Sequence, residues 1–383
     1  MSNIVWSFAV LAWEDVPLLN ALAAEAINKI TQGTAQDLSI TAWSFAQLGM
    51  WHQTLLDAIS AESIPKMPAF SCQQLSNPSW AFAVLGCADL PLLNAIASAA
   101  LPRIGGASQQ DLANTSWAFA TLSVLHLPLL EAIASSAIAP CSEFFIQGVS
   151  NTVWAFATIL FLHDPLMDAL AEAALPRISG QWTLSQNLAN TAWAFAILSV
   201  RNMPLLKAIA SSSLRLYRQF TPQDLANTAW SLATLQLCHD PLLSAISAPS
   251  IPRMSDFGMQ NLANLAWSMA QLSVWDLTLM EAIAAAASRR LIELGAQNIS
   301  NTAWAFAPLG IYNKPLLYAI AAASLRSISE FTPQNLGNTA WAFSTLQVEF
   351  SPLLNSISAE SLSKISQFGL QANTNIAWSW ATL

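Results

Sequence analysis

Three residue types that can hold a ligand recur along this chain at one fixed spacing. Around Trp230, Gln223 lies seven residues before the indole and Asn227 lies three residues before it. These offsets place the three side chains on one stripe of a helix, because residues three and four apart are neighbours on its surface. Carboxamides donate and accept hydrogen bonds, and indoles present a flat aromatic face. The stripe therefore suits either a ligand groove or contacts between repeated units.

The stripe is nearly invariant. Gln occupies its position in all ten units that contain it, and Asn occupies its own in ten of eleven, with Ile40 the exception. A residue that is identical in every unit cannot encode a varied ligand sequence. We therefore favour a structural ladder, in which amides bond the backbone of the next unit and indoles fill the gaps, over a row that faces a ligand. The copies that we single out are Gln110, Asn114, Trp117, Gln223, Asn227, Trp230, Gln334, Asn338 and Trp341.

Positions that vary between units are better candidates for reading a nucleic-acid sequence. The residue four after Trp is one of them, and Gln amides or Thr hydroxyls there can pair with base edges. The residue six before Trp also varies, and it either reads bases or caps the start of a helix. The candidates at the position four after Trp are Gln47, Thr121, Thr158, Thr234, Gln271 and Thr345.

Half of the fourteen basic residues form a second stripe, 23 residues after Trp. One interpretation places these cations at the negative end of a helix dipole. The other makes them a ladder that follows RNA phosphates. The net charge of the chain is −8, so affinity for nucleic acid has to come from this local stripe. Its members are Lys29, Lys66, Arg103, Arg177, Arg253, Arg290 and Lys364, with Arg326 displaced by one residue.

The histidines share one position and do not form a catalytic or metal-binding group. His52, His126, His163 and His239 each lie nine residues after Trp, where other units carry Asp or Asn. That interchange is typical of a turn or a helix cap. The sequence contains no glycine-rich phosphate loop, paired-carboxylate constellation or nucleophile elbow. We therefore expect a protein without enzymatic activity, metal or cofactor.

These side chains are positioned by an internal repeat. Each unit predicts two helices of about 16 and 14 residues: Thr221 and Pro222 are typical of the start of the first, and Pro241 of the second. One such hairpin cannot bury its own apolar face, so the units must stack. Pro78 and Pro308 are expected to kink or shorten their helices. Successive motif tryptophans are 37 residues apart, with one gap of 39: Trp6, Trp43, Trp80, Trp117, Trp154, Trp193, Trp230, Trp267, Trp304, Trp341 and Trp378.

The repeat predicts an all-α fold, an α-solenoid of about ten two-helix units that is expected to form a right-handed superhelix. It fills residues 1–383 as one continuous array. The composition is 54% hydrophobic and only 9% charged. Buried stacked helices explain these values, since Gln, Asn, Thr and Pro interrupt every apolar run, and we expect no membrane insertion. The four cysteines show no metal spacing or evident disulfide framework, which indicates a reducing compartment.

The repeated core Leu-x-Asn-Thr-x-Trp-Ala-Phe-Ala, as in residues 225–233 and 336–344, resembles the heptatricopeptide and octotricopeptide repeat proteins. Related arrays occur in the FAST-kinase-like family and in RNA-editing substrate-binding complex proteins. The resemblance covers the whole chain and implies sequence-selective binding of single-stranded RNA. It also implies a role in RNA processing, stability, editing or translation in the mitochondrion or the chloroplast, with other proteins of an RNA-processing complex as partners.

The chain departs from these families in three respects. Members often end in a domain named RAP, which we do not find in this sequence. Members are often basic, whereas this chain is acidic. Members carry a transit peptide, whereas here Asn3 and Trp6 already belong to a repeat. A protein without a transit peptide would otherwise be cytoplasmic. Neither end shows a polar capping unit, so we expect a fragment of a longer array.

A protein-binding scaffold is the competing function. Armadillo proteins also line a groove with Trp and Asn, and an acidic chain would suit an extended basic peptide. Their units are longer and three-helical, and their Asn follows the Trp. The location of the basic stripe discriminates the two functions: cations that face a groove favour RNA, and cations that pair with acids between units favour the scaffold.

Overall fold

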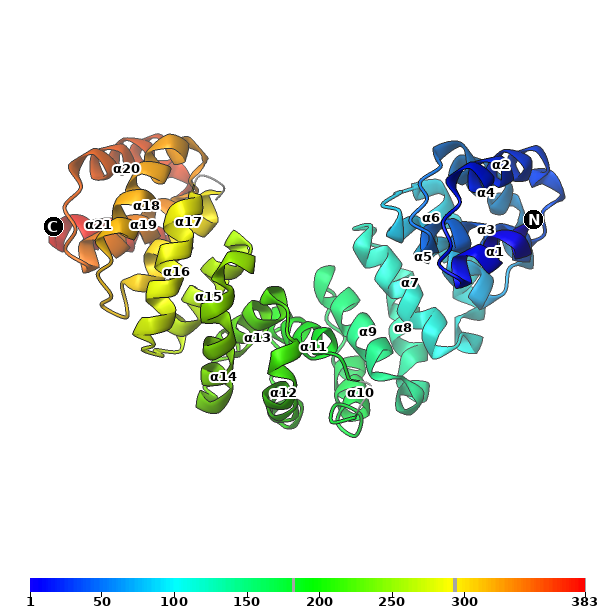
Figure 1. Cartoon of the computed structure of the whole chain (residues 1–383), viewed down its shortest axis with the longest axis horizontal. Coiled ribbons are helices and arrows are strands. Elements are labelled where there is room, and N and C mark those ends of the chain that lie inside the picture. Colours follow the sequence, from blue (N-terminus) through cyan, green and yellow to red (C-terminus); the bar gives the residue numbers. More distant parts are fainter. Residues whose placement is uncertain (181–182, 292–294, 383) are drawn as a thin grey trace. The chain divides into compact units, whose positions relative to one another are not determined.

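The structure is a computed structural model that describes residues 1–180, 183–291 and 295–382. Its helices alternate between two kinds, and the prediction of an all-α array of paired helices is confirmed. The odd-numbered helices, labelled in Figure 1, are those whose sequences contain the Gln–Asn–Trp stripe. They are α1 (Ser2–Val10), α3 (Ala35–Gln47), α5 (Cys72–Val84), α7 (Gln109–Thr121), α9 (Ile146–Thr158), α11 (Ser185–Ile197), α13 (Pro222–Thr234), α15 (Met259–Gln271), α17 (Ala296–Phe306), α19 (Pro333–Thr345) and α21 (Leu370–Thr382).

The even-numbered helices are the second member of each hairpin, and most continue into a short 3-10 helix before the next unit. They are α2 (Val16–Asn28), α4 (Gln53–Lys66), α6 (Leu90–Ala100), α8 (Leu127–Ile138), α10 (Asp164–Ala174), α12 (Met203–Leu216), α14 (Asp240–Ser250), α16 (Leu277–Arg290), α18 (Lys314–Ser327) and α20 (Ser351–Ser363). The 3-10 helices include η1 (Ile30–Gln32), η2 (Met67–Ala69), η3 (Leu101–Gly106), η4 (Ala139–Glu143), η5 (Tyr217–Gln219), η6 (Ile251–Asp256), η8 (Ile328–Glu330) and η9 (Ile365–Gln367).

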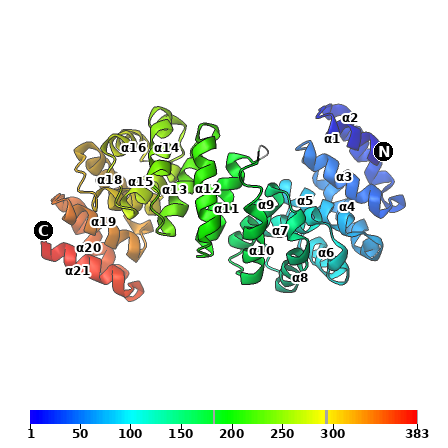
Figure 2. The same cartoon turned by 90° about the horizontal axis from the view of Figure 1, so that it is seen from below.

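The chain divides into two compact units. Unit 1 comprises Met1–Thr183 with Asn202–Leu205, and unit 2 comprises Leu184–Arg201 with Leu206–Leu383. Within each unit the odd-numbered helices pack side by side as one layer and the even-numbered helices form a second layer (Figure 2). Odd-numbered neighbours contact one another more extensively than even-numbered neighbours do. Each unit therefore has one closely packed helical face, formed by the layer that carries the stripe.

The odd-numbered helices begin where the sequence predicts. The Thr221 hydroxyl accepts from the Asp224 N–H, and the Asp224 carboxylate accepts from the Thr221 N–H, which makes a capping box. Four more units, beginning at Thr34, Ser71, Ser108 and Thr332, repeat the capping box. A cap of this kind satisfies two otherwise unpaired N–H groups. In these units the residue six before Trp is thus a helix cap, as one of the two interpretations predicts.

The odd-numbered helices end earlier than predicted, after 13 residues in most units. Six residues after Trp the backbone turns into the left-handed region, at Leu160 with φ 54° and at Gly86 with φ 67°. The next N–H reaches back into the helix, as Phe161 N donates to Phe156 O at 2.9 Å. This geometry is a Schellman-type end, and it stops the helix. Pro308 shortens α17 as predicted, whereas α5 keeps 13 residues despite Pro78.

Buried aromatic rings fill the space between the layers. Phe82 and Phe119, two residues after their Trp, are fully buried, and so are Phe220 and Phe257, ten residues before theirs. Full burial of a side chain of this size contributes about 1.5–3 kcal/mol. Because the same rings recur along the chain, consecutive hairpins within each compact unit are joined by an apolar core, and the stripe is held at a fixed spacing there.

Candidate functional site

The stripe lies on the solvent-facing side of the odd-numbered layer. In α7, Gln110 is exposed, whereas Asn114 and Trp117 are half-buried. The same order holds in α13 for Gln223, Asn227 and Trp230, and in α19 for Gln334, Asn338 and Trp341. The offsets of a helical stripe thus bring the three side chains of each unit to one surface, and stacking of the helices makes the stripes into rows.

Among the described residues, five pairs of motif indole rings on neighbouring helices contact each other. In unit 1 the ring centroids of Trp43 and Trp80 are 6.3 Å apart. In unit 2 five consecutive rings form a row with centroid separations between 6.2 and 6.5 Å: Trp230, Trp267, Trp304, Trp341 and Trp378. Tilted pairs at such distances contribute about 0.5–1.5 kcal/mol each beyond their burial. The indoles therefore act as contacts between hairpins and remain partly open to solvent.

The amides behave differently from the indoles. Among the described residues, one bond joins stripe amides of neighbouring helices, from Asn375 Nδ2 to Asn338 Oδ1 at 3.4 Å. Within the described ranges no side chain of a stripe Gln bonds the backbone of the next unit. Of the amide bonds between neighbouring units that the ladder predicts, the described residues thus show one, between α19 and α21. Most stripe amides keep donors and acceptors that a ligand can use.

These amides meet in grooves between odd-numbered helices. In unit 1 one groove is lined by Trp6, Gln36, Trp43, Gln73, Asn77 and Gln110, with three further residues. A second is lined by Gln110, Asn114, Gln147 and Asn151 together with Phe145. In unit 2 a groove between α19 and α21 holds Gln334, Asn338, Gln371 and Asn375. The stripe thus shapes polar hollows lined by carboxamides, and the two in unit 1 add aromatic surface.

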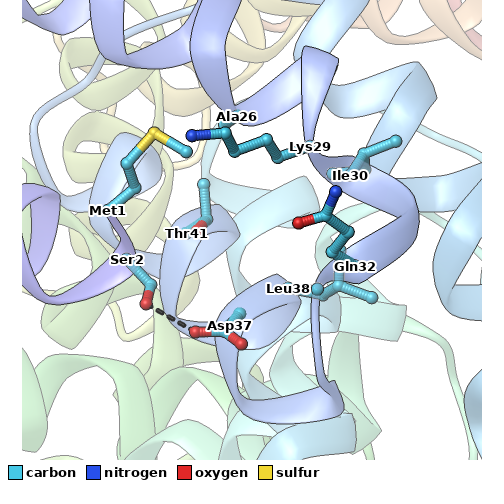
Figure 3. Close-up of a pocket in the computed structure, with 10 residues that line it drawn as sticks. Met1, Ser2, Ala26, Lys29, Ile30, Gln32, Asp37, Leu38 and Thr41 are labelled. Atoms are coloured by element: carbon cyan, nitrogen blue, oxygen red, sulfur yellow. Dashed lines mark hydrogen bonds between the residues drawn. The ribbon is translucent and has the colours of Figure 1, made fainter.

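The odd-numbered helices carry almost no charge. Within their bounds there is no Lys, Arg or Glu, and the three acidic residues are Asp37, Asp111 and Asp224. Each of these carboxylates caps its own helix and also accepts from a hydroxyl of the preceding unit. The Thr34 and Ser2 hydroxyls hold the pKa of Asp37 below its usual value. Figure 3 shows the Ser2–Asp37 bond in a small pocket at the edge of α3.

The candidates four residues after Trp separate into two groups. Gln47, Thr121 and Gln271 are exposed at the ends of their helices. Thr158 donates its hydroxyl to the Trp154 carbonyl at 2.8 Å. The hydroxyl oxygens of Thr234 and Thr345 are buried and have no partner in the structure. The surface of the odd-numbered layer thus offers the first three side chains to a ligand in full, and the other three only in part.

The basic stripe joins each hairpin to the preceding one. Lys66 Nζ donates to the carbonyls of Thr31 and Gly33 at 2.9 and 2.7 Å. Lys364 Nζ donates likewise to Ser329 O at 2.6 Å and Phe331 O at 2.8 Å. These carbonyls lie 33 or 35 residues earlier in the chain, at the end of the previous hairpin. Most members of the stripe therefore bridge consecutive units.

The arginines form the same bridge. Arg103 donates to Ala99 O at 2.5 Å and Pro68 O at 2.8 Å, and Arg177 donates to Ala173 O at 2.8 Å and to Ser142 O. Arg253 reaches Phe220 O at 3.0 Å, and Arg290 reaches Phe257 O at 2.9 Å. Lys29 pairs with Glu25, four residues earlier, at 2.7 Å, as Lys66 also pairs with Glu62 and Lys364 with Glu360. Arg326 is exposed at the end of α18. Neither predicted arrangement, cations in a groove or cations paired with acids between units, describes these carbonyl contacts.

The histidines cap the even-numbered helices, as the sequence predicts. His52, His126, His163 and His239 accept the N–H three residues on through Nδ1, at 3.1 or 3.2 Å. Asp15, Asp89, Asp276, Asn202 and Asn313 do so through an oxygen. Over the described ranges, no group of His, Cys, Asp and Glu side chains is arranged to hold a metal ion. No described helix combines the length and the apolar character needed to cross a membrane.

Comparison with known proteins identifies the family. The family described as RNA-editing substrate-binding complex 6 protein matches residues 1–179 and 185–383. The chain belongs to this family. The description names an RNA-editing complex and no catalytic activity. No curated protein matches the sequence. Among solved structures, the chain is similar to a homology model of the full-length AP-3 complex in an intermediate open conformation. That similarity has 12% identity and a TM-score of 0.34, and covers 93% of this chain and 75% of that one.

Proposed function

We propose that this RNA-editing substrate-binding complex 6 family protein binds single-stranded RNA in a sequence-selective way on the face of its odd-numbered helices. The observation that carries the proposal is the repeated set of an exposed Gln, a half-buried Asn and a partly open Trp, without charge, on that face. Through its family, the chain acts in an RNA-editing substrate-binding complex, together with RNA and other proteins. The mitochondrion is the compartment in which we place that complex.

The chemistry of the face suits bases better than phosphates. Single-stranded RNA is recognised through unstacked bases, which stack on aromatic rings and form hydrogen bonds along their edges. Stripe amides such as Gln110 and Asn114 supply paired donors and acceptors for those edges. Trp117, half-buried beside them, supplies ring surface. Gln47, Thr121 and Gln271, which differ between units and are exposed, are the candidates for sequence selectivity.

The basic stripe has a different part in this proposal. Lys66, Arg103 and Lys364 already donate to backbone carbonyls. They bring positive charge to one edge of the layer, but contact with phosphate would compete with those bonds. We therefore propose that base contacts provide most of the affinity and that phosphates contribute less than in a basic RNA-binding protein.

Three exposed glutamines of unit 1 provide the test. We expect Q73A/Q110A/Q147A to bind an RNA selected from a random single-stranded pool at least tenfold more weakly, because each change removes an amide without disturbing a core contact. Fluorescence anisotropy with labelled RNA measures the dissociation constant. Q219A, an exposed Gln in η5 away from the stripe, is the control and should bind as the wild type does. Equal affinity for the triple variant and the control would contradict the proposal.

An extended peptide is the second candidate ligand for this face. One observation favours it: the odd-numbered helices have no Lys or Arg, which RNA-binding surfaces usually use. Asn and Gln amides can also bond a peptide backbone. If the random RNA pool shows no saturable binding even at low salt, the peptide-binding scaffold becomes the preferred function.

A further inference from the structure

Acidic residues are concentrated in unit 1. By sequence, residues 1–183 with 202–205 carry 13 Asp and Glu against 4 Lys and Arg, a net charge of −9. The rest of the chain carries 9 acidic against 10 basic residues, a net charge of +1. The overall charge of −8 is therefore a property of unit 1. The four cations of unit 1 are engaged, since Lys29 pairs with Glu25 and the other three donate to backbone carbonyls.

The same unit exposes large apolar side chains at the turns between odd- and even-numbered helices. Trp13 is 63% exposed and Leu125 is 60% exposed. Single exposed apolar residues need no explanation, but a contiguous row marks an interaction surface. Here they recur at successive turns, seven to ten residues after the motif Trp, and the helices that follow pack on one another in order. The row, which we name the turn edge, consists of Trp13, Trp51, Leu90, Leu125, Leu127 and Leu162.

Carboxylates accompany this row. Leu127 and Glu131 are four residues apart on α8, so they share one face of the helix. Asp57 on α4 and Asp168 on α10 occupy the position equivalent to Glu131, and all three are exposed. The cations of unit 1 lie at or beyond the other end of the even-numbered helices, at Lys29, Lys66, Arg103 and Arg177. The turn edge is therefore both apolar and negative.

Unit 2 does not repeat this combination. At the positions of Leu125 and Glu131 it carries Arg201 and Lys207 in one repeat, and Cys238 and Ser244 in the next. Only the repeat that contains Trp275 and Glu281 resembles those of unit 1. The periodic fold thus does not require an apolar, acidic turn edge: three repeats of unit 1 have the combination, against one repeat of unit 2.

We propose that the turn edge of unit 1 docks a basic segment of another protein, one in which Lys or Arg alternates with apolar side chains. Burial of the exposed Trp and Leu would drive association, and the carboxylates would select cations and speed their approach. RNA is disfavoured there, because carboxylates without free neighbouring cations repel phosphates. The site is separate from the stripe, so one chain can hold RNA and a protein partner at once.

A labelled amphipathic Lys/Leu helix peptide of about 18 residues is the probe, used with the full chain and with a Glu/Leu peptide of equal length. We expect the Lys/Leu peptide alone to bind. D57K/E131K/D168K should weaken its binding at least tenfold. The matched control is D256K/E330K/E349K, which changes the charge by the same amount on exposed residues of unit 2 and leaves Glu281 in place. It should change the affinity less than threefold.

A second variant, W51S/L125S/L127S, separates apolar contact from charge and should also weaken peptide binding at least fivefold. Far-UV circular dichroism checks that every variant is folded. Equal weakening by the two charge-reversal triples would reduce the effect to general electrostatics and overturn the proposal, as would full binding by both. RNA affinity measured on the same variants distinguishes the two sites. If a variant loses peptide binding but keeps RNA binding, the change affects only the turn edge. If the wild type fails to bind RNA, only the proposal for the stripe is contradicted.

Discussion

At the residue scale, the position nine residues after Trp performs one task with three different side chains. His126 Nδ1 accepts from Leu129 N at 3.2 Å, Asp89 Oδ1 accepts from Leu92 N at 2.9 Å, and Asn313 Oδ1 accepts from Leu316 N at 3.0 Å. What these residues share is an acceptor atom at the right reach for an N-cap. The interchange of His, Asp and Asn at this position was therefore sufficient to predict the helix cap from the sequence.

The cap predicts a mutational pattern. H126A removes the acceptor for the Leu129 N–H and should lower the free energy of unfolding by about 1 kcal/mol, whereas H126N restores an acceptor and should be nearly neutral. Urea denaturation followed by circular dichroism compares the midpoints. The same loss in both variants would show that the imidazole contributes by packing rather than by capping.

The bridging cations predict a second pattern. R103M keeps the aliphatic stem but removes the donors to Pro68 O and Ala99 O, and should lower the unfolding free energy by about 1–2 kcal/mol. R201M, at an exposed arginine outside the basic stripe, is the matched control and should shift the urea midpoint little. A larger effect of R201M would contradict the bridging role of the stripe.

The cysteines give a test that does not depend on mutation. Burial raises the pKa of the Cys141 thiol to about 11, and only 5% of that residue is exposed. Because the thiolate is the reactive form, buried Cys141 should resist iodoacetamide at pH 8 in the folded protein. Cys238 should be alkylated because it is exposed, although its hydrogen bond to Asp240 also raises the pKa of that thiol. Mass spectrometry of digests measures both sites. In urea the two should react at similar rates; rapid native labelling of Cys141 would contradict its burial.

At the element scale, the starts of the helices could be predicted from the sequence and their ends could not. Thr221 followed by Asp224 three residues later is a capping box that any reader of the sequence can find. The end is set by a left-handed residue six after Trp, and Gly49, Gly86 and Gly310 are the visible signal for it. Other units place Leu160 or Gln347 there with the same positive φ, which hides the signal.

That turn predicts a stabilising substitution. A non-glycine residue in the left-handed region costs about 1 kcal/mol, and Leu160 is 73% exposed, so its side chain adds little in the isolated chain. L160G should therefore raise the unfolding free energy by up to about 1 kcal/mol. G86A, at the equivalent position, should lower it by a similar amount. Urea midpoints of the two variants should move in opposite directions; a shift of the same sign in both would refute the argument.

At the scale of the whole molecule, the repeat places the side chains that join neighbouring hairpins at different positions from the side chains that remain open to a ligand. Period and offset in the sequence were enough to place Gln110, Asn114 and Trp117 on one surface. They could not show that Lys66 and Arg103 reach the previous hairpin, because their partners are backbone carbonyls, which have no sequence signature. They also could not show that the amides seldom bond each other. Both results follow from stacking distance, which only the structure supplies.

The salt dependence of RNA binding distinguishes base contacts on the odd-numbered layer from phosphate contacts on the basic stripe. The log–log slope for single strands is about −0.7 per phosphate neutralised. If bases on the uncharged odd-numbered layer provide most of the affinity, the slope should be shallower than about −1.5, with saturable binding of a few enriched sequences. A slope steeper than about −3, made shallower by about 1.4 when Lys29 and Arg326 are both replaced by Met, would show that phosphates on the basic stripe hold the RNA and would contradict the base-dominated binding proposed here.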